Sequence, residues 1–358
     1  MKTKLTRILS IILALTVLFT VNAAALTSSE MADKLAKWLP KNITVAQAGE
    51  KIDSYLDWTV FAMARNGYTD YNDAYKAYIG NAVNKNRKSL YLNDYARISL
   101  AVMSVGMNAT DVDGNNLIDA IEKTDFTKEA FTGSVAYALI ALDSAKSNND
   151  TARNALKNIL LSAQRTDGGF NSYIVADEAS YWTVSGETDS TGIALQALAP
   201  YKSEENVKKA IEKAITFIKR EQMDDGGFGA WGSGSAESTS MILAGLCAIG
   251  ENSDSYTKNG KTMIDALSAY INEDGGGRCW DGSSNIMTSY QMLMGLSAYE
   301  RFKGGKVGLY DMSCLSPKCN SIEHLAIFAK FPAIGRLICR FVSVICGFIG
   351  FDYYCCKH

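Results

Sequence analysis

Acidic side chains occur near the start of several apolar segments of this chain, where they could bind a ligand or stabilise a helix. They are Asp57, Asp94, Asp189 and Glu237. An acid at the start of an apolar run is typical of a helix N-terminus, because its carboxylate accepts hydrogen bonds from backbone N–H groups that have no partner within the helix. We therefore expect these four acids to cap helices.

A second interpretation gives the acids a role in binding. If the helices that they precede all start at one end of the molecule, the acids would gather there with aromatic residues of the neighbouring loops and line a pocket. The candidate ligand-binding residues are then Asp94, Trp182, Asp189, Trp231, Glu237, Trp280 and Tyr290. The sequence alone leaves both interpretations open.

A weaker pattern lies between residues 111 and 122. Its spacing matches five ligand positions of an EF-hand-like calcium loop, at Asp111, Asp113, Asn115, Asp119 and Glu122. Two features depart from that motif, since Gly114 stands at the fourth position and Asn116 replaces the turn glycine. We expect a solvated loop that caps a helix, with calcium binding as the alternative.

A sequence repeat indicates which turns and helices position these side chains. One phrase occurs at residues 164–170, 222–228 and 272–277; it reads Gln-x-x-Asp-Gly-Gly-Phe in the first two copies and Asn-Glu-Asp-Gly-Gly-Gly in the third. Each copy is followed by a polar loop and an apolar run, at 189–198, 237–246 and 288–296. Such a period is typical of stacked supersecondary units, because one unit alone cannot bury its apolar face.

Two kinds of helical segment alternate along the chain. Six are apolar on nearly every side, which predicts burial all round, at 57–64, 94–102, 132–142, 189–198, 237–246 and 288–296. Six others are amphipathic and charged, at 28–39, 71–83, 117–122, 150–163, 204–221 and 259–270. Alternation of the two kinds predicts an all-α fold with an inner and an outer ring of six helices, an α6/α6 toroid spanning residues 26–312.

Several of these motifs resemble those of a known protein superfamily. The Gln-x-x-Asp-Gly-Gly-Phe phrase before a buried helix resembles the repeat of the terpenoid cyclase and protein prenyltransferase superfamily. Residues 57–66, 197–201, 232–239, 296–302 and 309–312 are similar to bacterial secreted proteins with prenyltransferase and squalene oxidase repeats, and to the α-domain of transcobalamin and intrinsic factor. The resemblance covers about residues 28 to 312 and implies the same toroid.

The chain departs from the catalytic motifs that this resemblance implies. It has no Asp-x-Asp-Asp sequence, the motif with which related cyclases protonate an alkene. Its two histidines, His324 and His358, lie outside the predicted toroid, so the Asp, Cys and His zinc set of the prenyltransferases is absent from the toroid sequence. The transcobalamin-like resemblance implies a corrinoid, but nothing from Ser313 onward resembles the β-domain that completes that site. We expect no catalytic residue and no firm cofactor.

Both ends of the chain differ from the toroid. Residues 1–25 combine three basic residues, an apolar run and small residues, which predicts a secretory signal peptide; an uncleaved anchor is the alternative. Residues 313–358 form an apolar tail that carries six of the eight cysteines. This tail could associate with a membrane, pack on the toroid or on a partner, or stay unstructured; no Cys-x-x-Cys pair favours zinc.

The charge composition bears on which class of partner the chain could bind. The chain has 36 basic and 38 acidic residues and no basic stripe, which argues against nucleic-acid binding. We therefore expect an exported, non-catalytic toroid at the cell surface that binds a small molecule or a partner, with possible membrane association through the tail. The alternative is a terpenoid cyclase-like or prenyltransferase-like enzyme that acts on an isoprenoid through an atypical site.

Overall fold

The computed structural model describes residues 25–177, 180–230 and 232–313. The predicted signal peptide and tail lie outside these residues, apart from Ala25 and Ser313 at their edges. Helices dominate the described residues, together with one short antiparallel strand pair, β1 (Phe228–Ala230) and β2 (Ser233–Ser235). None of the helices described is long and apolar enough to cross a lipid bilayer.

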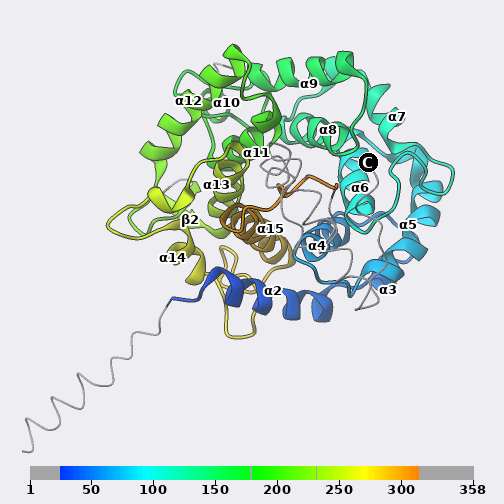
Figure 1. The fold of residues 1–358 in the computed structure, drawn as a ribbon, viewed down its shortest axis with the longest axis horizontal. Helices are drawn as coiled ribbons and strands as arrows, with labels where there is room; N and C mark the ends of the chain where they lie inside the picture. The colour runs from blue at the N-terminus through cyan, green and yellow to red at the C-terminus, as the bar shows by residue number, and fades with distance from the viewer. Residues whose placement is uncertain (1–24, 178–179, 231, 314–358) are drawn as a thin grey trace, which may run out of the picture.

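Within the described residues, six helices form an inner ring around a common axis (Figure 1). In chain order they are α4 (Ser54–Arg65), α6 (Leu92–Ser104), α8 (Thr132–Ser144), α11 (Thr188–Leu198), α13 (Ala236–Ile249) and α15 (Ile286–Lys303). Each helix contacts the next, and α15 also contacts α4, so the ring is closed.

An outer ring surrounds the inner one (Figure 1). Its helices are α2 (Ser28–Asn42), α5 (Asn72–Asn86), α7 (Leu117–Glu122), α9 (Asp150–Ser162), α12 (Glu205–Glu221) and α14 (Met263–Ser268). From α5 to α14, each packs on the inner helix that precedes it in the chain, whereas α2 packs on α15. Short elements connect the rings: α3 (Val45–Ala48), α10 (Tyr181–Val184) and the 3-10 helices η1 (Arg87–Ser89), η2 (Phe126–Lys128), η3 (Ala199–Tyr201) and η4 (Ser253–Ser255).

Burial follows the two sequence patterns. Along α12 the buried residues are Val207, Ala210, Ile211, Ala214, Phe217 and Ile218, which recur every three or four positions and form one apolar face. In α13, by contrast, nearly every residue is buried, because outer helices cover one side and inner helices the other. The predicted all-α fold with two rings of helices is confirmed.

Some predicted boundaries shift, for local reasons. The last inner helix, α15, begins before the predicted residue 288 because Asn285 caps its start and accepts hydrogen bonds from the N–H groups of Met287 and Thr288, and it continues past the predicted residue 296 to Lys303. The outer helix α14 is shorter than the predicted 259–270, because Lys258 and Lys261 first pair as an isolated β-bridge.

The repeated phrase forms a turn that joins an outer helix to an inner one. In the second copy, Gly226 has φ +86, a conformation that glycine adopts at little cost. The Asp225 carboxylate accepts a 2.9 Å hydrogen bond from the N–H of Gly227, and the Thr239 hydroxyl in α13 accepts one of 2.9 Å from the N–H of Phe228. Equivalent groups serve the other copies, namely Asp167, Gly168 and Thr191, and Asp274, Gly275 and Ser289. These hydrogen bonds give the repeated phrase a structural role as the turn between the two rings.

The first outer helix, α2, closes the ring against the third copy. The indole Nε1 of Trp38 donates a 2.9 Å hydrogen bond to the Asp274 carboxylate, and the N–H of Leu26 donates one of 2.8 Å to the Ser268 hydroxyl. In the second copy, Gln222 donates to the carbonyl of Tyr256, just before α14. In the earlier repeats, the next outer segment along the chain packs against the turn. Among the described residues no further repeat follows the last one, and helix α2 packs there instead.

Candidate functional site

The N-terminal turns of the inner helices meet at one end of the ring, which we call the N-terminal mouth. The rings of Tyr55 in α4 and Tyr290 in α15 lie 6.5 Å apart there, and the hydroxyl of Thr288 donates a hydrogen bond to Glu237 in α13. Asp189, in the first turn of α11, interacts with Glu237 and with the hydroxyl of Ser238. The mouth therefore brings acids and aromatic rings together from different repeats.

The predicted capping role of the acids is wrong in most of its detail. The described helices begin earlier than expected, so the N-cap positions belong to Asp53 in α4, Tyr91 in α6, Glu187 in α11 and Ser235 in α13. Only Asp94 shares in a cap, since its carboxylate accepts a 3.0 Å hydrogen bond from the N–H of Tyr91. The acids lie within the first turns, where the helix dipoles still favour negative charge.

Asp189 is the acid with the most distinctive setting. Its side chain is exposed, yet it lies within the rim of the ring, and no backbone N–H of the described residues binds its carboxylate at close range. The surrounding protein removes water that would solvate the charge, and the nearby Glu237 and Glu187 repel it, so the pKa of Asp189 is raised despite a hydrogen bond from Ser238. A raised pKa at a mouth is typical of a group kept for function.

Glu237 is held firmly in the same mouth. Its carboxylate accepts a 2.8 Å hydrogen bond from the hydroxyl of Ser235, the N-cap residue of its own helix, and another from Thr288 of the neighbouring helix. These two contacts hold the carboxylate in place near enough to Asp189 for the two charges to repel each other. Two carboxylates on adjacent helices form an anionic edge that a cation could neutralise.

Asp94 belongs to a buried ionic network that the sequence analysis missed. Arg97 donates a 2.8 Å hydrogen bond to Asp94 and a 2.9 Å hydrogen bond to Asp57, which also accepts one of 2.7 Å from the hydroxyl of Tyr75. Asp57 and Arg97 are both buried. An arginine inside an otherwise apolar helical run was the available signal, because a buried arginine requires an acidic partner.

Aromatic side chains fill the centre below the mouth. The rings of Trp58 and Tyr137 lie 4.6 Å apart, and the ring of Phe61, one turn further along α4, stacks on Tyr310 with a centroid distance of 5.3 Å. Tyr137 also lies close enough to Asp189 and Tyr290 for their charges to raise its pKa further, beyond the effect of its burial. The acids of the mouth consequently lie next to aromatic rings that occupy the centre.

Two of the three loop tryptophans predicted to line a pocket, Trp182 and Trp280, are exposed. Trp182, in α10, exposes 58% of its surface, and Trp280, in the turn before α15, exposes 95%. Trp231 lies outside the described residues. Tyr290 is different, because it is buried within the mouth and lies near Glu237 and Arg97.

The acidic segment at 111–122 is divided between a turn and a helix. Asn115 is buried and donates to the side chain of Asn84, while Asp119 forms a 2.7 Å ion pair with Lys123 on α7. Asn116 caps α7 by accepting from the N–H of Asp119. Among the described residues, no group of three or more His, Cys, Asp or Glu side chains is arranged to hold a metal ion.

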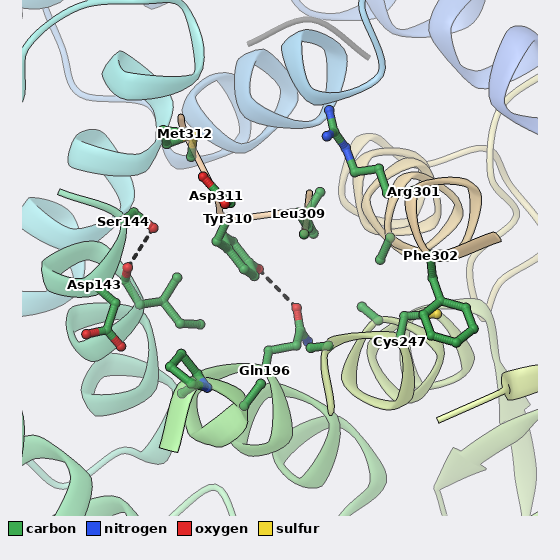
Figure 2. Close-up of a pocket in the computed structure, with 18 of the residues that line it drawn as sticks. Asp143, Ser144, Gln196, Cys247, Arg301, Phe302, Leu309, Tyr310, Asp311 and Met312 are labelled. Atoms are coloured by element: carbon green, nitrogen blue, oxygen red, sulfur yellow. Dashed lines mark hydrogen bonds between the residues drawn. The ribbon is translucent and has the colours of Figure 1, made fainter. Parts of the chain in front are cut away.

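The opposite end of the ring, the C-terminal mouth, contains a cavity of about 1010 Å³. It is bounded by the C-terminal turns of four inner helices, with Ile140 from α8, Ala197 from α11, Cys247 from α13 and Phe302 from α15 (Figure 2). Burial raises the pKa of the Cys247 thiol to about 12, so this thiol stays protonated and unreactive. Sequence reasoning placed a pocket at the other mouth and missed this one.

Residues 304–313, which we call the strap, cross the C-terminal mouth. Tyr310 points from the strap into the centre, where its hydroxyl donates a 3.1 Å hydrogen bond to Oε1 of Gln196 (Figure 2). Arg65 donates to the carbonyls of Gly308, Leu309 and Asp311 at 3.1, 2.7 and 2.9 Å. The strap is thus fixed through its backbone carbonyls. Side-chain patterns in the sequence therefore could not predict its position.

A second arginine completes the anchor of the strap. Arg301 of α15 donates to the carbonyl of Val307 at 3.3 Å and to the carbonyl of Arg65 at 2.6 Å. Burial and the proximity of Arg301 lower the pKa of Arg65 to about 9, against the attraction of Asp311. Both guanidinium groups are buried at the end of apolar helices, where backbone carbonyls compensate their desolvation.

Comparison with known proteins agrees with this architecture. Residues 125–298 match the family model of the squalene-hopene cyclase C-terminal domain. The predicted terpenoid cyclase and protein prenyltransferase superfamily is confirmed. The chain is also similar to the solved structure of the ent-copalyl diphosphate synthase from Streptomyces platensis, with 16% sequence identity and a TM-score of 0.42. The match covers 70% of this chain and 50% of that protein, so the chain spans about half the length of this relative.

Proposed function

We propose that this toroid is an exported binding protein that captures a ligand at its N-terminal mouth without transforming it. The observation that carries the proposal is the occupied centre of the ring, where Tyr310 stacks on Phe61 and bonds to Gln196. A cyclase-like reaction needs a deep cavity that encloses the substrate and excludes water. Aromatic rings instead occupy the centre, and the N-terminal mouth presents acidic and hydroxyl side chains.

The chemistry of the mouth favours a cationic ligand. Asp189 and Glu237 offer two carboxylates on neighbouring helices, and the rings of Tyr55 and Tyr290 lie close to the same edge. Carboxylates attract an ammonium or guanidinium group, and aromatic faces stabilise it by cation–π attraction of about 0.5–2 kcal/mol. An organic amine or a basic side chain of a partner fits this combination.

Calorimetric titration tests the proposal. The probes are tetraethylammonium and an arginine-containing tripeptide, with a neutral tripeptide of the same length as the ligand control. We expect binding of the cationic probes only, weakened about tenfold by Asp189→Asn or Glu237→Gln, since a charged hydrogen bond contributes about 1.5–3 kcal/mol. Glu212→Gln, on the exposed side of α12, is the matched control. Equal binding by all four proteins would rule out the mouth as the site.

A second candidate function is an enzyme of the cyclase or prenyltransferase type. The family match at residues 125–298 favours it, as does the raised pKa of Asp189, which suits a proton donor. Incubation with geranylgeranyl diphosphate and with squalene, followed by mass spectrometry of products, separates the two functions. Turnover that Asp189→Asn abolishes while the fold is retained would replace the binding proposal.

Export, surface attachment and corrinoid capture remain proposals of the same kind. Export rests on the predicted signal peptide, and attachment on the apolar tail. A corrinoid would have to bind without the β-domain of transcobalamin-like proteins. Fractionation of cells that express the full chain, followed by N-terminal sequencing of the processed protein, tests export. Addition of cyanocobalamin to the purified chain, read by its absorption after gel filtration, tests corrinoid binding.

A further inference from the structure

The cavity at the C-terminal mouth lies where the described chain ends. Ser313, the last described residue, lines this cavity together with Met312 and Leu309 of the strap. Buried Arg65 and Arg301 fix the strap, so the exit point of the chain is fixed as well. Forty-five residues, 314–358, follow Ser313 in the sequence.

We propose that residues 325–331 of the same chain dock into this cavity at the C-terminal mouth. This segment, Leu-Ala-Ile-Phe-Ala-Lys-Phe, is the first strongly apolar stretch after the strap. It begins 12 residues beyond Ser313, and an extended chain covers about 3.3–3.6 Å per residue, so a connection of that length can turn back into the cavity without strain.

The lining of the cavity suits such an occupant. Small apolar residues form one part of its wall, including Ala197, Ala244 and the exposed Ala248, and the partly exposed ring of Phe302 adds an aromatic face. Charged side chains, among them Lys146 and Lys306, line the rest and could stay hydrated at the rim. Burial of Leu325, Ile327 and Phe328 against them would remove apolar surface from water on both sides, at roughly 25 cal/mol per Å². Concavities of this size that combine apolar faces with a few polar groups are typical of binding sites.

The covalent connection makes this occupant the favoured one. A segment joined to its site by a short stretch of the same chain has an effective concentration there in roughly the millimolar range, so it outcompetes a free apolar ligand or a second copy of the chain at ordinary protein concentrations. Docking would also join the tail to the toroid. The proposal does not depend on what the N-terminal mouth binds.

Photo-crosslinking of the full chain tests the proposal. A p-benzoylphenylalanine is placed at Phe328, the monomer is irradiated, and the crosslinked peptides are identified by mass spectrometry. We expect links to residues 244–250 and 298–313 within one chain. Ala248→Arg should reduce their yield at least fivefold by filling the cavity, while Ala77→Arg, exposed on outer helix α5, should leave it unchanged.

A second measurement does not alter the toroid at all. In the full chain, Leu325→Asp, Phe328→Asp and Phe331→Asp together should increase amide exchange at residues 244–250 and 306–313, because the cavity wall would lose its cover. Unchanged exchange would contradict the proposal. Crosslinks between chains, or links to lipid in the presence of phosphatidylcholine and phosphatidylglycerol vesicles in place of the cavity peptides, would overturn it in favour of self-association or membrane insertion.

Discussion

At the scale of single residues, the pair formed by Asp57 and Arg97 is the most demanding interaction of the inner ring. Both side chains are buried, and Tyr75 supplies the second partner of the Asp57 carboxylate. Asp57→Ala would leave the Arg97 charge with Asp94 alone, and we expect a loss of about 3–5 kcal/mol in the free energy of unfolding, measured with urea. Asp224→Ala, on an exposed turn, should change it by less than about 0.5 kcal/mol.

Asp189 should make stability depend on pH. Its pKa is raised in the folded protein above the ordinary value of 3.8, so between these two pKa values the folded state binds more protons than the unfolded state, and stability falls as pH rises through that window. Asp189→Asn should therefore increase the free energy of unfolding at pH 7 and change it much less at pH 3.5. The measurement is urea unfolding at both pH values. A variant less stable than the parent at pH 7 would contradict this assignment.

The sequence predicted which residues lie at the N-terminal mouth better than it predicted what each of them does there. Acids and Tyr290 were expected at one end of the ring, and Asp94, Asp189, Glu237 and Tyr290 do lie in its first turns. Their roles were not predictable, because the residue that caps a helix is fixed by the position at which the helix begins. A shift of a few residues in that position moves the N-cap to another residue. Trp280 illustrates the same limit, since a loop position gives no information on whether the ring faces the mouth or solvent.

At the scale of elements, glycines set how closely the inner helices approach. A Cβ on Gly192 of α11 would lie 2.4 Å from backbone atoms of Met241 in α13, whereas one on Gly133 of α8 would meet no atom within 4 Å. Gly192→Ala should therefore force the helices apart and cost about 1–3 kcal/mol. Gly133→Ala should be neutral or stabilise by up to about 1 kcal/mol. Thermal and urea unfolding of both variants measure the contrast; equal effects would show that the close approach is not limiting.

The paired helices were predictable because both signals are periodic and local. An apolar run such as 237–246 and an amphipathic one such as 204–221 each specify a helix and its degree of burial. The strap was not predictable for the opposite reason. Its anchors are carbonyl groups, which every residue carries, and its key side chain, Tyr310, meets Phe61 and Gln196 only after the whole ring has formed.

At the scale of the whole molecule, stability depends on closure between α2 and the last repeat. Trp38→Phe removes the donor to Asp274, whose carboxylate also accepts hydrogen bonds from Ser284 and Gly276. We expect a loss of about 1–2 kcal/mol, since one charge-assisted hydrogen bond is removed at a partly exposed site. Amide exchange should rise both in α2 and at residues 271–277, which are far apart in sequence. Trp280→Phe, at a highly exposed tryptophan, should change neither.

The contact of α2 with α14 and α15 also limits how such a chain can evolve. In an open solenoid, duplication of one repeat simply lengthens the array, because each unit touches only its neighbours. Here a seventh helix pair would have to fit between partners that already meet, and a missing pair would leave them too far apart. Gain or loss of one helix pair would therefore change the curvature that every other pair must adopt. We expect related sequences to differ mainly by substitutions and by the loops at the two rims.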